Sequence, residues 1–275
     1  MWKHIRRILM VLLAAVFLFC GGTVAVVQHQ YQVNKRLYRE AASSFTTQTA
    51  AVPSGPSLFK KTDPGELKPE TESGEMAPIE VDFEALKKVN PDVIGWIYCP
   101  DTVINYPVMH GETNDTYLHH SYDGTYNASG SIFEDARNGR GFVDPVSILY
   151  GHHMASGAMF ATLDRWQAVD YFYEHPVMWL LTPTRDYKVE LCSAYNTSAY
   201  SDTYSFFTDH GFGFAEYLRK VISQSVIRTG VEADPNPNYI LISTCAYVFE
   251  DARSVLLGKL VPLASAGGKP ITITK

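Results

Sequence analysis

The stretch YILISTC, residues Tyr239 to Cys245, joins four apolar residues to two hydroxyl residues and a cysteine. A short apolar run that polar residues bound predicts a buried strand. A strand that ends at a cysteine places the thiol at the edge of a sheet, where a second molecule can reach it. A small buried cysteine that only packs is the commoner outcome for such a residue. A reactive thiol therefore needs partners elsewhere in the chain.

Two other segments supply such partners. The run VSILY, Val146 to Tyr150, predicts a second strand, and His152 follows it after one glycine. Arg253 comes eight residues after Cys245, and residues 246–252 can turn the chain back so that the two lie on adjacent antiparallel strands. A thiolate attacks carbonyls, an imidazole moves protons and a guanidinium stabilises an oxyanion. The three residues fit a thiol acyl-transfer site, and an exposed Arg253 paired with a nearby carboxylate is the competing interpretation.

Other classes of site fit the sequence less well. A zinc site built from histidines 119, 120, 152 and 153 lacks both an H-E-x-x-H helix and a pair of C-x-x-C motifs. We therefore expect no metal and no cofactor. The formal net charge of −6, with acidic residues spread along the chain, argues against a nucleic-acid partner.

The N-terminal region predicts a membrane anchor. Ile8 to Val27 holds 20 residues without a charge, which is enough for a membrane-spanning helix. Lys3, Arg6 and Arg7 precede it, so residues 1–7 are expected to be cytoplasmic and the remainder extracellular. A cleaved signal peptide is the alternative, although its apolar core is usually about 7–15 residues and ends at a small-residue cleavage site. We expect a single-pass protein of the cell membrane.

The predicted membrane topology determines the environment of each cysteine. Cys20 lies in the apolar segment, while Cys99, Cys192 and Cys245 would face a space in which disulfides form. Because three is an odd number, at least one thiol has no partner within the chain. A Cys99–Cys192 disulfide is compatible with the sequence, but nothing in it requires one. Catalysis is one reason for an exported protein to keep a free thiol.

Composition divides the rest of the chain into two parts. Residues 28–79 are rich in Gln, Ser, Thr, Pro and Glu, which predicts an extracellular stalk with little order, although residues 28–42 could continue the membrane helix. From residue 80 onward aromatic and β-branched residues become dense, and residues 80–275 are long enough for one domain with a sizeable core.

Local patterns within this domain predict mainly β-structure. We expect one short helix over residues 82–89, with Asp82 as its N-cap, and two more at Met159 to Leu163 and Phe214 to Ser225. Short strands are expected at 93–98, 105–109, 131–133, 146–150, 178–181, 188–195, 239–243 and 254–261. Many short strands with irregular connections favour an all-β barrel or sandwich.

Several segments, taken in order, resemble the sortases and in particular the class B sortases. The segments that carry the resemblance are Gly95–Tyr98 (GWIY), Ile104–Val108 (INYPV), Asn114–Leu118 (NDTYL), Gly130–Phe133 (GSIF), Tyr150–Met154 (YGHHM), Ser243–Cys245 (STC), the spaced Arg253 and Leu257–Leu260 (LGKL). The resemblance covers about residues 80–262. It implies an eight-stranded β-barrel with peripheral helices, and a helical insertion between Tyr195 and Tyr239, before the cysteine strand.

The resemblance also implies roles for residues. By motif, Cys245 is the nucleophile, His152 the general acid and base, and Arg253 the group that holds the oxyanion or positions the substrate. The family's substrate groove is matched by Tyr150, Ser243, Thr244, Asn114 and Leu118. Ala246 departs from the pattern, because some class B members have an acidic residue there, and it offers no carboxylate to assist the thiol.

The implied activity is that of a membrane-anchored cysteine transpeptidase. Such an enzyme cleaves a C-terminal sorting signal after Thr through a thioacyl-enzyme, and joins the secreted protein to an amine of a peptidoglycan precursor in the Gram-positive cell wall. Three alternatives stay open at this point: a pilin polymerase that uses a Lys amine, a secreted cysteine protease, and a tethered binding module on a sortase barrel without activity.

Overall fold

The computed structural model describes residues 2–49 and 76–263. The chain forms two compact units, Met1–Ala41 and Ala42–Lys275. The first consists of most of helix α1 (Trp2–Phe45), whose most apolar 18-residue window has a mean hydropathy of 2.6 and is not buried by any other part of the protein. This helix is long and apolar enough to cross a membrane.

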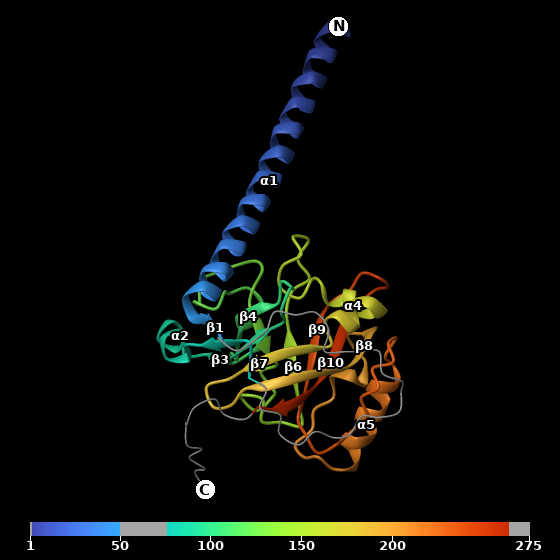
Figure 1. The fold of residues 1–275 in the computed structure, drawn as a ribbon. Coiled ribbons are helices and arrows are strands. Elements are labelled where there is room, and N and C mark those ends of the chain that lie inside the picture. The colour runs from blue at the N-terminus through green and yellow to red at the C-terminus, as the bar shows by residue number, and fades with distance from the viewer. Residues whose placement is uncertain (1, 50–75, 264–275) are drawn as a thin grey trace. The chain divides into compact units, whose positions relative to one another are not determined.

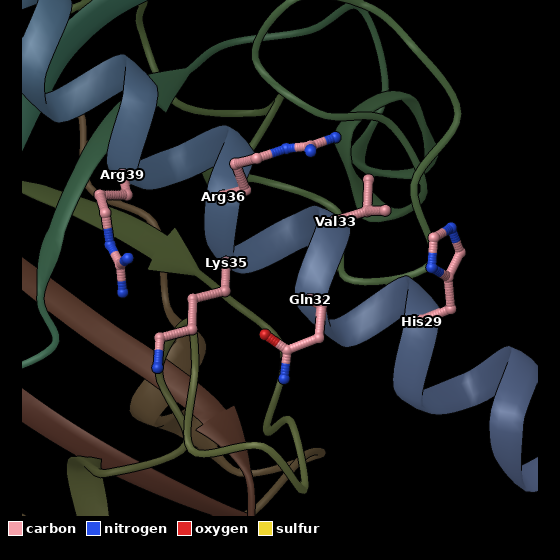
Figure 2. A pocket seen from close by; sticks show the side chains of 6 residues that line it. All are labelled: His29, Gln32, Val33, Lys35, Arg36 and Arg39. Carbon is pink, nitrogen blue, oxygen red and sulfur yellow. The ribbon is translucent and has the colours of Figure 1, made fainter.

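The end of α1 that follows the apolar segment is basic. Figure 2 shows His29, Lys35, Arg36 and Arg39 along this stretch of the helix. Arg36 pairs with Glu40 one turn later, at 3.8 Å between Nε and Oε1. Such an exposed pair contributes at most about 1 kcal/mol.

Eight strands of the second unit close into a barrel (Figure 1), which confirms the predicted mainly-β fold. Around the barrel the order is β10-β8-β7-β3-β4-β5-β6-β9, and every pair is antiparallel except β4–β5 and β6–β9. The strands are β3 (Val93–Tyr98), β4 (Asn105–Met109), β5 (Ile132–Glu134), β6 (Val146–Tyr150), β7 (Val177–Leu181), β8 (Tyr187–Ser198), β9 (Tyr239–Cys245) and β10 (Ala252–Pro262). All eight predicted strands exist, and β8, β9 and β10 are longer than expected by two residues or more.

Shorter elements surround the barrel. They are β1 (Thr46–Gln48) paired with β2 (Ile79–Val81), α2 (Phe83–Val89), α3 (Asn114–Leu118), the 3₁₀ helix η1 (Leu163–Gln167), α4 (Val169–Glu174), the 3₁₀ helix η2 (Asp202–Tyr204) and α5 (Phe212–Ser223). Asp82 caps α2 as predicted, accepting a 2.9 Å hydrogen bond from the backbone N–H of Ala85. The predicted stalk at 28–79 overlaps the end of α1 and strand β1, and its residues 50–75 lie outside the described part of the chain.

The predicted helix over Met159 to Leu163 is wrong. Met159 has a positive φ of 57°, which an α-helix does not tolerate, and its backbone N–H donates to the hydroxyl of Tyr106. Its side chain and that of Phe160 are fully buried, so the chain turns here in order to fill the core. Helical structure begins only at η1 and continues in α4.

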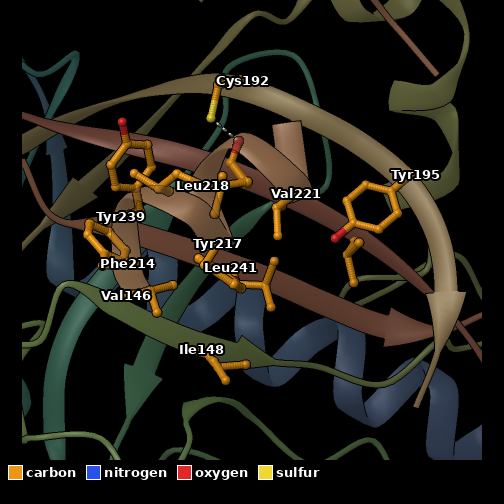
Figure 3. Close-up of a cluster of buried hydrophobic side chains, with 12 residues drawn as sticks. Val146, Ile148, Cys192, Tyr195, Phe214, Tyr217, Leu218, Val221, Tyr239 and Leu241 are labelled. Atoms are coloured by element: carbon orange, nitrogen blue, oxygen red, sulfur yellow. Dashed lines mark hydrogen bonds between the residues drawn. The ribbon is translucent and has the colours of Figure 1, made fainter. Parts of the chain in front are cut away.

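The apolar run of β9 follows from burial on both of its faces. Side chains alternate along a strand, and Tyr239 and Leu241 pack into a cluster beneath α5, as Figure 3 shows. Ile240 and Ile242 are also fully buried and point to the opposite face, toward the inside of the barrel. Helix α5, the insertion predicted at Phe214 to Ser225, therefore covers one face of the barrel wall.

The same face continues beyond α5 toward the ends of three strands. In register across the sheet, Tyr150 of β6 lies beside Ser243 of β9, and Arg253 of β10 lies opposite Cys245. The alternation that points Leu241 at α5 also points Ser243 and Cys245 to this side of the sheet. Four of the predicted site residues thus lie where the helical cover ends: Tyr150, Ser243, Cys245 and Arg253.

Candidate active site

Cys245 is the last residue of β9 and is partly exposed. Arg253 is directly opposite it on β10, in the antiparallel register that the spacing of eight residues predicted. The guanidinium is half-buried, and its Nη1 donates a 3.0 Å hydrogen bond to the backbone carbonyl of Ala252. The turn between the strands thus brings a thiol and a fixed cation together.

The segment after β6 runs beside the end of β9. The N–H of Gly151 donates to the carbonyl of Ser243 at 3.2 Å, and the hydroxyl of Thr244 donates back to the carbonyl of Gly151 at 2.8 Å. A Cβ at Gly151 would lie 2.5 Å from a carbon of Ile132 and 2.6 Å from Phe160, which explains the glycine at this position. This close packing fixes the backbone that carries the next residue, His152.

The imidazole of His152 is oriented by a carbonyl of α3. Its Nε2 lies 2.8 Å from the backbone oxygen of Leu118. Because a carbonyl oxygen only accepts hydrogen bonds, Nε2 carries the hydrogen and Nδ1 is the nitrogen left to exchange a proton. The ring of His119 stacks beside it, with the centroids 5.9 Å apart.

His153 has a different partner from its neighbour. Its Nδ1 donates a 2.8 Å hydrogen bond to the backbone carbonyl of Cys245, and its ring meets the ring of Tyr247 edge to face at 5.1 Å. The two adjacent histidines therefore bind different elements, His152 the end of α3 and His153 the end of β9. His152 presents a free nitrogen, while His153 secures the backbone that carries the thiol.

A line of aromatic residues continues from the thiol along the sheet. Tyr204 of η2 shares a 2.8 Å hydrogen bond with the buried hydroxyl of Ser243, and its ring stacks on that of Tyr150 at 6.4 Å between centroids. Burial raises the pKa of Tyr204 to about 12, while its bond to Ser243 and the charge of Arg253 act in the opposite direction.

A pocket of about 340 Å³ opens on this side of the protein. Its lining residues are Arg137, Tyr150, Ala199, Tyr200, Ser201, Tyr204 and Arg253. Two of them, Tyr150 and Arg253, were predicted site residues. A volume of this size is at the small end of the range for ligand pockets, so it suits a short stretch of a larger molecule.

The remaining predicted groove residues support the backbone around the site. Thr244 is buried, and its hydroxyl is committed to Gly151. Asn114 begins α3, and its Oδ1 accepts a 2.8 Å hydrogen bond from the N–H of Ala136. Leu118, partly exposed at the end of α3, supplies the carbonyl that orients His152. Asn114 and Thr244 therefore hold adjacent loops in place through their side chains.

The other thiols differ from Cys245. All four cysteines are free, so Cys99 and Cys192 do not form the disulfide that the sequence left open. Both are buried, with the Sγ of Cys192 donating to the carbonyl of Leu257 at 3.2 Å. Burial raises the pKa of Cys99 and that of Cys192 to about 12. Of the thiols in residues 76–263, only that of Cys245 is partly exposed.

Sequence reasoning missed four residues of this site: His153, Tyr204, the pocket residue Arg137, and Asp135, whose buried carboxylate accepts hydrogen bonds from Arg137 and from the hydroxyl of Tyr150. All four lie in connections between strands, and no spacing rule places such residues beside a distant strand. A weak signal existed for one pair, because an acid and an arginine two residues apart in a loop can form a local ion pair. The tight segment after β6 could also have drawn attention to His153.

Comparisons with known proteins agree with this geometry. No protein-family model matches the chain. The chain is 32% identical to Sortase B of Listeria monocytogenes over 263 residues, which cover 94% of this chain and 98% of that protein. The structure of a Staphylococcus aureus sortase B–substrate complex matches with a TM-score of 0.62 and 28% identity, over 66% of this chain and 85% of that one. Sortase B from Bacillus anthracis in complex with AAEK1 matches with a TM-score of 0.67 and 27% identity, over 85% of this chain and 99% of that one.

Proposed function

We propose that this chain, which belongs to the sortase B family and is a cysteine transpeptidase, transfers peptides through a thioacyl intermediate on Cys245. One observation carries the proposal above all. Cys245 and Arg253 lie opposite each other at the ends of β9 and β10, and His152 leaves β6 beside them with one ring nitrogen free. This arrangement joins a nucleophile, a proton carrier and a fixed cation.

In the first half-reaction, the thiolate of Cys245 attacks the carbonyl carbon of a Thr in the sorting signal. The tetrahedral oxyanion is stabilised by the N–H donors of Arg253. The bond from this carbon to the following nitrogen then breaks, and the imidazolium of His152 gives its Nδ1 proton to the departing amine. The N-terminal part of the substrate remains on the enzyme as a thioester.

In the second half-reaction an amine attacks the thioester carbonyl. His152 takes the proton from the attacking nitrogen, and the sulfur leaves as a thiolate when the new amide forms. The attack forms a second tetrahedral oxyanion, which Arg253 stabilises as it does the first. Loss of one such donor typically lowers the rate by a factor of about 10²–10³.

The proposed substrates are secreted proteins with a C-terminal sorting signal, and the proposed acceptor is an amine of a peptidoglycan precursor. The substrate complex of the Staphylococcus aureus sortase B supports the first of these. We further propose that residues 8–27 anchor the protein in the cell membrane, with residues 1–7 in the cytoplasm, residues 28–79 as a stalk and residues 80–275 outside the cell. The length and composition of α1 support this anchor. Digestion of the domain by a protease added to intact cells would test the orientation.

The experiment uses the purified full-length protein and peptides that carry a Thr within candidate sorting signals. Mass spectrometry reads the products without an amine, with triglycine, and with a Lys side-chain amine. We expect a thioester on Cys245 and a transfer product with triglycine. Cys245→Ala should give neither, and Arg253→Ala should give about 10²–10³-fold less. Full turnover by Cys245→Ala would overturn the proposal. Hydrolysis alone would indicate a protease, and exclusive use of the Lys amine a pilin polymerase.

A further inference from the structure

One face of α1, just beyond its apolar segment, carries a cluster of cations that the proposed mechanism does not use. A pocket of about 330 Å³ on this face is lined by His29, Gln32, Val33, Lys35, Arg36 and Arg39. All six side chains are exposed, and Figure 2 shows them along one stretch of the helix. We call Lys35, Arg36 and Arg39 the α1 cluster. Each of these three side chains ends in nitrogens that only donate hydrogen bonds, so the cluster suits an acceptor.

The α1 cluster is positive in a chain that is acidic overall. The full chain has a formal net charge of −6, yet Glu40 is the only acidic residue between residues 28 and 49. Glu40 lies 3.8 Å from Arg36, in a pair so exposed that solvent screens most of its attraction. Lys35 and Arg39 form no ion pair within the described part of the chain. The cluster therefore has positive charge to offer to an anion.

Two aromatic residues of α1 indicate where the surfaces of a bilayer would meet the helix. Trp2 and Tyr31 are 29 residues apart in one continuous helix, which at 1.5 Å per residue is about 44 Å. A bilayer with its headgroup layers is about 40–45 Å thick. Trp and Tyr favour these two layers, and the uncharged residues 8–27 lie between them. Tyr31 therefore marks the outer edge of the headgroup layer at which the α1 cluster begins.

The three cations lie within reach of that layer. Along the helix axis Lys35 is about 6 Å beyond Tyr31, Arg36 about 8 Å and Arg39 about 12 Å. The Cβ atoms of a helix tilt toward its N-terminus, so long flexible side chains after the apolar segment can reach back toward the membrane. Charges act on one another over about 8 Å at physiological salt. Headgroup charges therefore act on this cluster more strongly than on cations farther along the chain.

Charge complementarity selects the kind of lipid. A guanidinium binds two oxygens of a phosphate at once, and an ammonium binds phosphate as a point charge. An anionic phospholipid presents its phosphate without a compensating cation, whereas a choline headgroup carries its own positive charge. A pocket of about 330 Å³ suits one such headgroup, and Val33 among the cations offers an apolar contact beside it.

We propose that the α1 cluster is a lipid-binding site, in which Lys35, Arg36 and Arg39 bind the phosphate groups of anionic phospholipids in the bilayer that α1 spans. The contact holds the helix at one depth in the membrane. This assignment rests on the proposed function only for the membrane anchor. It is independent of the transfer chemistry at Cys245 and of the side of the membrane on which the barrel lies.

Native mass spectrometry of the full-length protein tests this contact apart from catalysis. The protein is held in detergent micelles with equal amounts of phosphatidylglycerol and phosphatidylcholine of the same acyl chains, and the lipids that stay bound are counted. We expect at least about tenfold more phosphatidylglycerol than phosphatidylcholine, since each Lys or Arg near an anionic surface strengthens binding about fivefold. Glycerol 1-phosphate, which has the phosphate but no acyl chains, is the soluble arm of the experiment and should not be retained.

Two triple variants locate the site. The combination of Lys35→Gln, Arg36→Gln and Arg39→Gln should lower the number of bound phosphatidylglycerol molecules by at least about half and leave phosphatidylcholine unchanged. The matched control combines Lys88→Gln, Arg185→Gln and Arg219→Gln, which remove three exposed cations from the barrel unit, and it should change neither number. Because Gln keeps a high helix propensity, α1 should stay helical, and equal far-UV circular dichroism checks this.

Each outcome bears on the proposal. Unchanged binding of phosphatidylglycerol by the α1 variant overturns it, even if the parent enzyme transfers peptides normally. Retention of glycerol 1-phosphate as strong as that of the lipid would indicate a site for free phosphate and overturn the choice of a bilayer lipid. Loss of lipid only in a variant of Lys3, Arg6 and Arg7 would assign the lipid to the other end of the apolar segment and overturn the α1 site.

The proposed activity and the lipid site can fail separately. Selective lipid binding that the α1 variant loses, in a parent protein that transfers no peptide, would support the lipid site and remove the proposed activity. Release of the full-length protein from vesicles by alkaline carbonate would overturn the membrane anchor, and the lipid site with it.

Discussion

Selective alkylation of Cys245 is the sharpest test of the difference between the thiols in the barrel domain. Burial raises the pKa of Cys99 and that of Cys192 from 9.0 to about 12. At pH 8 about one thiol in ten is ionised when its pKa is 9.0, and about one in ten thousand when its pKa is near 12. Since only the thiolate attacks iodoacetamide, ionisation alone slows the two buried thiols about a thousandfold relative to an ordinary cysteine.

The assay treats the folded full-length protein with iodoacetamide at pH 8 and follows each cysteine peptide by mass spectrometry. Cys245 should be labelled at least about a thousandfold faster than Cys99 or Cys192. Cys20 is read from its own peptide and does not enter this ratio. In denaturing urea, where burial is lost, the three rates should come within about tenfold of one another.

Labelling of Cys99 or Cys192 in the folded protein within tenfold of the rate at Cys245 would refute this reasoning. Such a result would mean that the barrel opens often enough to expose its interior thiols, or that burial does not control their ionisation. Slow labelling of all three thiols would instead remove Cys245 as an accessible nucleophile.

Three further predictions follow from individual contacts. The free energy of unfolding should fall as the pH rises above about 9, because the raised pKa values keep Cys99 and Cys192 protonated in the folded chain while the unfolded thiols ionise. Each thiol lowers it by about 1.4 kcal/mol per pH unit up to about pH 12. If urea unfolding of Cys192→Ala gives the same dependence of this free energy on pH as the parent protein, the prediction is contradicted. Tyr204→Phe should cost about 1–3 kcal/mol, since it leaves the buried hydroxyl of Ser243 without its partner, and Ser243→Ala should cost less, since the hydroxyl of Tyr204 is only partly buried. The double variant should cost clearly less than the sum of the two, and strict additivity in chemical denaturation would exclude the coupling. A methyl group at Gly151 would lie 2.5 Å from a core side chain, so Gly151→Ala should destabilise the protein by about 1–3 kcal/mol. The same change should displace the imidazole of His152 and lower kcat/KM by more than tenfold. Unchanged kinetics would show that this packing does not position the site.

Elements with strong local patterns could be predicted from the sequence. The apolar run of β9 and the capped helix α2 each have the pattern that their local structure requires. The opposition of Cys245 and Arg253 was also predictable, because a short connection between two strands leaves little choice of register. In these places local preference and the final fold agree.

The structure differs from the sequence prediction where packing at long range decides the outcome. Helices η1 and α4 have five and six residues, which is too short for a periodic pattern to become visible. The local pattern predicts a helix at Met159, but this residue has a positive φ and its side chain is fully buried in the core. Arg137 reaches the pocket because β5, β6, β9 and β10 are neighbours in the sheet, and this pairing of strands distant in the sequence has no signature in the loop that carries Asp135 and Arg137.

The helical insertion and the site form one continuous structure. Tyr217 of α5 donates a 2.9 Å hydrogen bond to the carbonyl of Thr203, and Lys220 of the same helix pairs with Asp202, so α5 holds η2 at two points. The last residue of η2, Tyr204, then reaches Ser243.

Because Ser243 lies two residues before the thiol on the same face of β9, the insertion supports the wall along which a substrate would bind. The cluster beneath α5 and the aromatic line beyond it are successive parts of a single packed layer, which Tyr150 and Tyr204 join at its open end. The position of the groove is therefore set by the hydrophobic packing of α5 as much as by the strands that carry the catalytic candidates.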